Sequence, residues 1–105
     1  MTSWSEDRVR PVIHLLAGPW VLGVLGELDA GELRRVELRR RLGGVSDKVL
    51  TETLGRLEDA GWVHRRFTPG APAQADYSLT KTGQSLFPIL ESVQAWTDEH
   101  PDAVA

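Results

Sequence analysis

One side of a predicted helix over residues 46–61 carries short or hydrogen-bonding groups at three- and four-residue steps. These residues are Lys48, Thr51, Glu52, Gly55 and Arg56. A lysine can bind a phosphate or a guanine, a threonine can contact a base edge or a thymine methyl group, and a carboxylate can accept a hydrogen bond from a cytosine amine. Such a side can enter a groove, although most polar helix faces, with carboxylates such as Glu52, are only solvated.

The opposite side of the same helix is apolar, so the fold must bury one face to present the other. The apolar stripe consists of Val49, Leu50, Thr53, Leu54 and Leu57. Ser46 is a predicted N-cap and also a candidate contact, and Asp47 adds negative charge where the helix dipole favours it. Gly61 follows as a C′ residue that accepts a left-handed conformation. These signals predict a helix of roughly four turns.

A second predicted helix, over residues 35–42, carries three consecutive arginines. They are Arg39, Arg40 and Arg41. Successive helical residues point in different directions, so the three cannot share one surface. We expect one or two to reach a phosphate and the others to be exposed or paired with Glu37. Residues 43–45, Gly-Gly-Val, then allow a tight turn into the next helix, which is the arrangement of a helix-turn-helix.

Positive charge is concentrated in the middle of the chain. Residues 34–66 hold nine basic and five acidic groups, a balance of +4, whereas the rest of the chain holds three basic and ten acidic groups. Arg65 and Arg66 extend this region along a predicted strand, where side chains alternate, so at most one of them points toward a partner. The net charge of −3 is therefore compatible with one face that meets phosphates.

Hydrophobic periodicity and chain breakers predict the remaining elements. Further helices are predicted over residues 9–17, 20–29 and 81–99, and strands over residues 62–67 and 75–80. A short connector at residues 32–34 is a candidate for a single extended strand. Thr80 is the predicted N-cap of the last helix, and Pro88 should kink or delay that helix because proline lacks a backbone donor.

This order of elements predicts an α+β, mainly α, fold in a single domain over residues 1–105. It is a winged helix-turn-helix with a two-stranded β-hairpin wing and terminal helices. The predicted parts are a helix-turn-helix at about residues 35–61, a wing at about 62–80 and a C-terminal helix at about 81–99. In such a motif the second helix, here residues 46–61, is the one presented to the major groove.

The residues from 11 to 100 resemble the HxlR-type transcriptional regulators, which are relatives of the MarR group. The resemblance is carried by four runs in the right order: ELRR at 37–40, GxSxKxLTxTLxxLE at 44–58, DAGWV at 59–63 and YSLTxxGxSLxPxL at 77–90. It implies a homodimer formed through terminal dimerisation helices, with the C-terminal dimerisation helix at about residues 81–99. The dimer would place a recognition helix and a wing on double-stranded DNA and regulate nearby genes.

The chain departs from that family's pattern at several positions. Residues 17–20 read AGPW where the family usually has GGKW, Glu52 stands where glutamine is common, and Gly55 stands where arginine is frequent. In the wing, residues 73–76 read AQAD instead of PRVE, so Gln74 could replace the missing arginine only by weaker hydrogen bonds. These changes predict an altered affinity or target sequence within the same docking mode.

Composition excludes several classes of chemistry. The chain of 105 residues has no cysteine, which rules out thiol sensing, disulfides and thiolate metal sites. Its three histidines lack a metal-ligand spacing, and no glycine-rich phosphate loop or activated nucleophile is visible, so we predict no metal, no cofactor and no enzymatic activity. Neither a secretion signal nor a membrane span is expected, which predicts a cytoplasmic protein.

The leading hypothesis is a homodimeric, sequence-specific repressor on an inverted-repeat operator. Without thiols, its switch would be a small non-covalent effector, and the predicted site lies between the terminal helices near Trp20, Phe87 and Trp96. The alternative is a winged-helix protein-interaction module without DNA binding, which the acidic net charge and the altered wing would favour.

Overall fold

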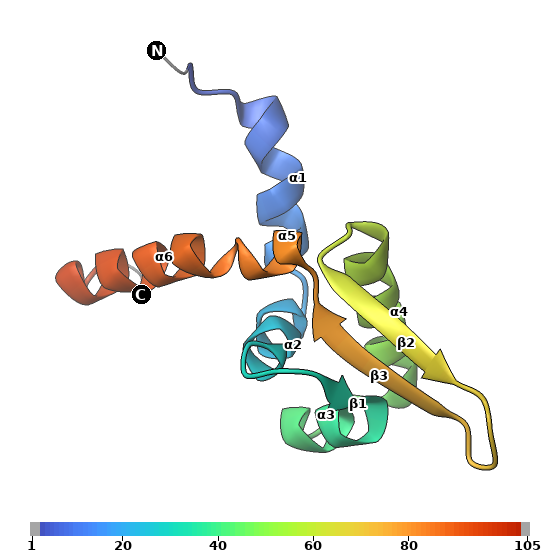
Figure 1. Ribbon diagram of the computed structural model, residues 1–105. Coiled ribbons are helices and arrows are strands. Elements are labelled where there is room, and N and C mark those ends of the chain that lie inside the picture. The colour runs from blue at the N-terminus through green and yellow to red at the C-terminus, as the bar shows by residue number, and fades with distance from the viewer. Residues whose placement is uncertain (1–2, 104–105) are drawn as a thin grey trace.

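The computed structural model describes residues 3–103, in which three strands form one small sheet and the helices lie around it or project from it. In chain order the elements are α1 (Glu6–Leu16), α2 (Val21–Leu28), β1 (Leu33–Arg34), α3 (Arg35–Leu42), α4 (Asp47–Asp59), β2 (Val63–Thr68), β3 (Gln74–Leu79), α5 (Lys81–Gln84) and α6 (Phe87–Glu99). The helices α2, α3 and α4 gather beside the sheet, whereas α1 and α6 project from this body in different directions (Figure 1).

The core lies where α2, α3 and α4 meet the sheet. Its fully buried members include Leu25 of α2, Leu38 of α3, and Leu50, Leu54 and Leu57 of α4. The predicted stripe on α4 is confirmed, because Thr53 is buried with these leucines and Val49 is partly buried against them. Burial of the stripe leaves the opposite side of α4 free.

Val36 is an apolar residue of α3 that does not face the core. Its side chain is 75% exposed, while Leu38 on the same helix is fully buried. Residues two apart on an α-helix point about 200° away from each other, so a single helix face cannot bury both. Leu38 packs into the core that includes α2, and Val36 therefore lies on the surface.

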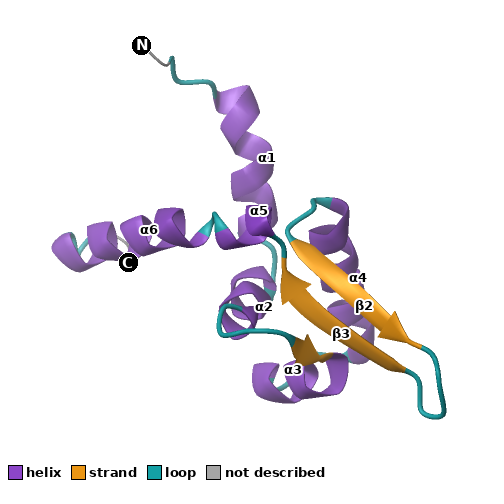
Figure 2. Ribbon diagram, viewed as in Figure 1, coloured by secondary structure: helices purple, strands orange, loops and turns teal. Residues whose placement is uncertain are grey.

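The sheet has three antiparallel strands in the order β1-β3-β2 (Figure 2). The hairpin of β2 and β3 was predicted, and the extended connector is confirmed as β1, which pairs Leu33 with Tyr77 and Arg34 with Asp76. Asp76 also lies opposite Arg66 of β2. Strand β1 thus connects β3 of the wing to the start of α3, which begins at the next residue, Arg35.

The predicted C-terminal helix over residues 81–99 is divided into α5 and α6. Thr80 caps α5 as predicted, since its hydroxyl oxygen accepts a hydrogen bond from the backbone N–H of Gly83 at 3.0 Å. Pro88 occupies the first turn of α6, where a missing N–H leaves no helical bond unmade. The predicted helix is therefore interrupted after Gln84 and begins again at Phe87, as expected from a proline that kinks or delays it.

The projecting helices carry apolar side chains that nothing in the described chain covers. On α6, Ile89 and Val93 are each 57% exposed and Trp96 is 50% exposed, and the three recur at positions i, i+4 and i+7. Ile13 of α1 is 56% exposed. Neither helix contains a fully buried residue. Both helices thus present unsatisfied apolar surface away from the body.

The first helix begins at Glu6, three residues before the predicted start. Glu6 and Asp7 place negative charge in its first turn, where the helix dipole stabilises it. Among residues 3–103 no helix alone is long and apolar enough to cross a membrane; α1 and α2 meet that test only when counted together, and they are bent by 79°.

Candidate nucleic-acid interface

The outward side of α4 presents the residues that the sequence assigned to it. Lys48, Thr51, Glu52 and Arg56 are exposed, and Gly55 between them is half-buried. The start of the helix is fixed by Ser46, whose side-chain oxygen accepts a hydrogen bond from the Val49 N–H at 3.1 Å. The predicted cap is confirmed, and the Ser46 hydroxyl keeps its own hydrogen for an external acceptor.

The arginine that sequence reasoning missed at this site is Arg35, the first residue of α3. Its Nη2 donates to the Asp47 carboxylate at 2.7 Å, to the Asp47 carbonyl at 3.2 Å and to the Thr51 hydroxyl at 2.9 Å. The hydrogen bond from the guanidinium lowers the pKa of Asp47. No local spacing signals this cluster, because its members lie twelve and sixteen residues apart and meet only through the fold.

The three arginines of α3 have different surroundings. Arg40 donates twice to Glu37, at 2.6 and 3.0 Å, and Arg41 donates to the same carboxylate at 3.0 Å and lies 3.7 Å from Glu27. Pairing of one or two of them with Glu37 was expected. Arg39 instead donates to the Val45 carbonyl at 3.3 Å and forms no ion pair with a described carboxylate.

The Glu37 carboxylate stays ionised across the working range of pH. Hydrogen bonds from Arg40 and then from Arg41 lower its pKa to about 2, against an ordinary value of 4.5. A depressed pKa means that the charged pair persists as the pH falls and is lost only near that lower value. Near neutral pH, therefore, a phosphate would have to compete with the Glu37 carboxylate for Arg40.

The two arginines of the wing lie on opposite faces of β2, as strand geometry predicts. Arg65 lies over the Phe67 ring, with 5.5 Å from its guanidinium carbon to the ring centroid. Arg66 instead pairs with Glu32 at 2.6 Å and lies 3.6 Å from Asp76. The pair with Glu32 joins residues 34 apart in the chain, so no local sequence pattern indicates it. Of the two, Arg65 is the one whose charge is not balanced by a carboxylate among the described residues.

A hollow of about 470 Å³ lies between the wing and α3. Its lining consists of Arg34, Arg35, Val36, Arg39, Asp47, Phe67, Pro72, Ala73, Gln74 and Ala75. The candidate Gln74 is half-buried at the start of β3 and belongs to this lining. The hollow lies between the wing and the first helix of the helix-turn-helix. The predicted contacts Arg39, from that helix, and Gln74, from the wing, therefore line the same surface.

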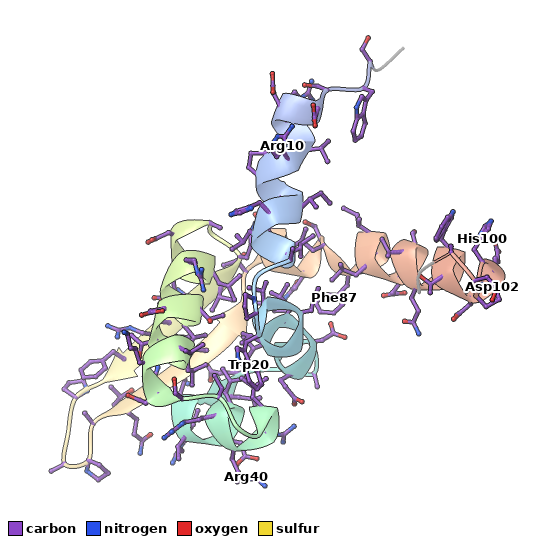
Figure 3. The ribbon with its side chains drawn as sticks, turned by 180° about the vertical axis from the view of Figure 1, so that it is seen from behind. Arg10, Trp20, Arg40, Phe87, His100 and Asp102 are labelled. Carbon is purple, nitrogen blue, oxygen red and sulfur yellow. The ribbon has the colours of Figure 1, made fainter. Side chains whose placement is uncertain are left out.

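The three aromatic residues assigned to an effector site are not gathered within one chain. Trp20 and Phe87 are partly buried against the core, and Phe87 lies where α6 leaves the body (Figure 3). Trp96 lies nine residues farther along α6, about 13 Å by the helical rise, and stacks on His100 with ring centroids 4.4 Å apart. The effector site at these residues stays a prediction.

Comparisons with known proteins agree with this geometry. Residues 15–104 match the protein family described as HxlR-like helix-turn-helix. YvaP of Bacillus subtilis, an uncharacterised HTH-type transcriptional regulator, is 35% identical over 95 residues, which cover 90% of this chain and 88% of YvaP. The reduced form of the B. subtilis transcriptional regulator YodB superposes with a TM-score of 0.85 at 27% identity over the whole of both chains.

A third similar structure is the redox regulator HypR in its oxidised form, with a TM-score of 0.75, 29% identity, and coverage of 88% of this chain and 95% of HypR. The family match and the relative YvaP each cover most of the chain. The chain therefore belongs to the HxlR-like helix-turn-helix family of transcriptional regulators.

Proposed function

We propose that this regulator binds double-stranded DNA as a homodimer, with α4 in the major groove and the wing beside it. The observation that carries the proposal is the division of α4 into two sides. One side is sealed in the core, while the other exposes Lys48, Thr51 and Arg56. Lys48 and Arg56 form no ion pair with any carboxylate in residues 3–103, so their charges are available to phosphates.

Two cations outside α4 support the same surface. Arg39 and Arg65 are exposed and carry charge that no described carboxylate offsets, and Arg39 borders the hollow between α3 and the wing. Ser46 and Gln74 add hydrogen-bonding groups next to them. Arg40 and Arg66 are the weaker candidates, since each must leave a carboxylate to reach a phosphate. Glu52 would contact DNA only at a base amine, because phosphates repel it.

The projecting helices support the homodimer. The apolar row on α6 and the exposed Ile13 on α1 are the kind of surface that a second copy of the chain would cover. A two-fold axis between two subunits would place their α4 helices in successive major grooves, about 34 Å apart, on an inverted repeat. A dimer seated on promoter DNA excludes polymerase, so repression is the direction that we propose.

The switch of this regulator cannot be a thiol. HypR is described as a redox regulator, whereas this chain contains no cysteine. We therefore propose control by a non-covalent small molecule bound between the terminal helices near Trp20, Phe87 and Trp96, where a second chain would have to bring these residues together. One core and one sheet within residues 3–103 support a single domain. We also propose that the protein is located in the cytoplasm, because its proposed partner is chromosomal DNA.

Neutralising Lys48 tests the proposal directly. Lys48→Gln should weaken binding to DNA from around the protein's own gene and flatten the dependence of log affinity on log salt by about 0.9 per subunit, the effect of one lost phosphate contact. Fluorescence anisotropy across a salt series measures both quantities. Lys81→Gln is the matched control, because it removes the same charge from α5, outside the proposed surface. DNA binding without salt dependence, or none at low ionic strength, would refute the proposal.

Removing the carboxylate of Glu37 should have the opposite effect. Glu37→Gln releases Arg40, which has no other described carboxylate partner, so affinity for DNA should rise several-fold and the salt dependence should steepen by up to about 0.9 per subunit. Asp102→Asn makes the same change of net charge at the far end of α6 (Figure 3) and should have little effect. Equal changes in the two variants would mean that only net charge matters and that Arg40 lies away from the phosphates.

The competing function is a protein-interaction module without DNA binding. It is favoured by the carboxylates that already neutralise Arg40 and Arg66, and by the net charge of −3. The Lys48 experiment separates the two functions, since an interaction module would show no salt-sensitive affinity for DNA at low ionic strength.

A further inference from the structure

The hydroxyl of Thr51 has little hydrogen-bonding capacity left for a base. A threonine hydroxyl has one hydrogen to donate and two lone pairs to accept with. In the structure Thr51 Oγ1 donates to the Asp47 carbonyl at 3.0 Å and accepts from Arg35 Nη2 at 2.9 Å. The hydrogen and one lone pair are thus committed within the protein, and the remaining lone pair lies beside a guanidinium cation.

Although its oxygen is engaged, the Thr51 side chain is exposed. Its backbone lies in the second turn of α4, where the helix covers most main-chain atoms. Beyond Cβ the side chain has only a hydroxyl and a methyl group, so with the hydroxyl engaged the methyl is the group left for a contact with an outside surface. Lys48 and Glu52, both exposed, lie three residues before and one residue after Thr51 on α4.

Arg35 keeps Thr51 in this arrangement. The side chain of Arg35 is only 25% exposed, and its Nη2 contacts three oxygens of α4: the Asp47 carboxylate, the Asp47 carbonyl and the Thr51 hydroxyl. A planar guanidinium fixed by several acceptors has little freedom to release one of them. Rotation of Thr51 that turned its hydroxyl outward would break both of its hydrogen bonds.

We propose that Thr51 recognises a thymine through a contact between methyl groups, and that Arg35 is the positioning residue that prevents the hydroxyl from reading a base instead. Thymine is the base that places a methyl group in the major groove, and it does so through C5. This inference rests on the proposed DNA binding and specifies the base class that α4 would select. Arg35 touches no DNA in this scheme and acts only through Thr51.

Replacing thymidine by deoxyuridine tests the contact, because it removes only the C5 methyl. The probe is the duplex that wild-type protein selects from a randomised library, resynthesised with deoxyuridine at one symmetric pair of positions at a time. One pair should weaken binding by about fourfold per half-site, the factor expected for burial of one methyl-sized group. Every other replacement should leave affinity within about twofold.

Two substitutions at position 51 separate the methyl from the hydroxyl. Thr51→Val keeps a methyl and loses the hydroxyl, so it should retain the thymidine to deoxyuridine affinity ratio. Thr51→Ser keeps the hydroxyl and loses the methyl, so the ratio should fall to about one while salt-sensitive binding persists. Thermal unfolding of both variants checks that each remains folded.

Arg35→Met tests the positioning role. With Arg35 absent the Thr51 hydroxyl can turn toward the groove, and the ratio should decrease toward one. In a Thr51→Val background there is no hydroxyl to release, so the same change at Arg35 should leave the ratio unaltered. A purely structural role for Arg35 would lower the affinity for both duplexes together in both backgrounds and would overturn this assignment.

The outcomes distinguish this inference from the proposed function. If no deoxyuridine replacement weakens binding, or if Thr51→Ser keeps the ratio, the methyl contact is wrong while salt-sensitive DNA binding still stands. If wild-type protein selects no duplex at all, the proposed DNA binding fails and the methyl contact fails with it.

Discussion

Replacing Val93 with arginine should separate the proposed dimer and weaken DNA binding by a factor of about 10² to 10⁴. Val93 is 57% exposed at the centre of the apolar row on α6, between Ile89 and Trp96. A guanidinium there would have to be buried without a partner when two copies meet, which costs several kcal/mol. A separated subunit then binds each half-site independently and loses the gain from a second, tethered contact.

The fold of each subunit should survive this change, because Val93 has no buried contact within its own chain. Light scattering coupled to size exclusion gives the mass in solution, and anisotropy with an inverted-repeat duplex gives the affinity. Gln94→Arg adds the same charge to the neighbouring position, about 100° around the helix, and should leave both values near those of the wild type. A dimeric Val93→Arg protein with unchanged affinity would remove α6 from the interface.

Local signals in the sequence were sufficient to place the recognition helix. A side-chain oxygen before the first turn, a glycine after the last and an apolar stripe between them predicted the ends and the orientation of α4. The structure confirms the cap at Ser46 and gives Gly61 a φ of 77°. Each of these effects acts within a few residues of the chain, so the ends and the buried face of α4 can be predicted from the local sequence.

The surroundings of the candidate contacts could not be read in the same way. Pairing of an α3 arginine with Glu37 follows from helical spacing and was expected for those that do not reach a phosphate, but Arg40 itself was a candidate for DNA contact. The contacts from Arg35 to Thr51 and from Arg66 to Glu32 depend on how α3, α4 and the sheet pack, and no sequence period marks them. The same limit applies to Val36 and Leu38 of α3, since which of two apolar positions on a short helix is buried depends on the neighbour that covers it.

These contacts change the meaning of the basic middle of the chain. A balance of +4 over residues 34–66 suggests a uniform positive surface. In the fold, Arg40 and Arg66 are offset by carboxylates, and Arg35 is committed to Asp47. The cations left for an outside anion are fewer and lie on α4 and at Arg34, Arg39 and Arg65. We therefore expect a moderate salt dependence set by these positions, and specificity that depends more on the shape of α4 than on net charge.

Replacing Gly83 with alanine should lower the free energy of unfolding by about 3 kcal/mol, near the upper end of the usual cost of overpacking. A Cβ at this position would lie 2.1 Å from the Trp62 carbonyl oxygen and 3.1 Å from its carbon. That oxygen cannot easily move, because it accepts a hydrogen bond from the Thr80 N–H at 3.0 Å. The Gly83 N–H is itself held by the Thr80 hydroxyl, so α5 is fixed against the start of β2 from both sides.

Gly55→Ala is the matched control for this clash. Gly55 lies inside α4, and nothing lies within 4 Å of its built Cβ, so the same substitution should stabilise the protein by about 0.5–1 kcal/mol through helix propensity. Urea unfolding at one protein concentration compares the two variants, since the stability of a dimer depends on concentration. Opposite signs are expected. A Gly83→Ala midpoint at or above that of the wild type would show that α5 can shift away from Trp62, and that the joint through which α6 leaves the body is looser than the fold indicates.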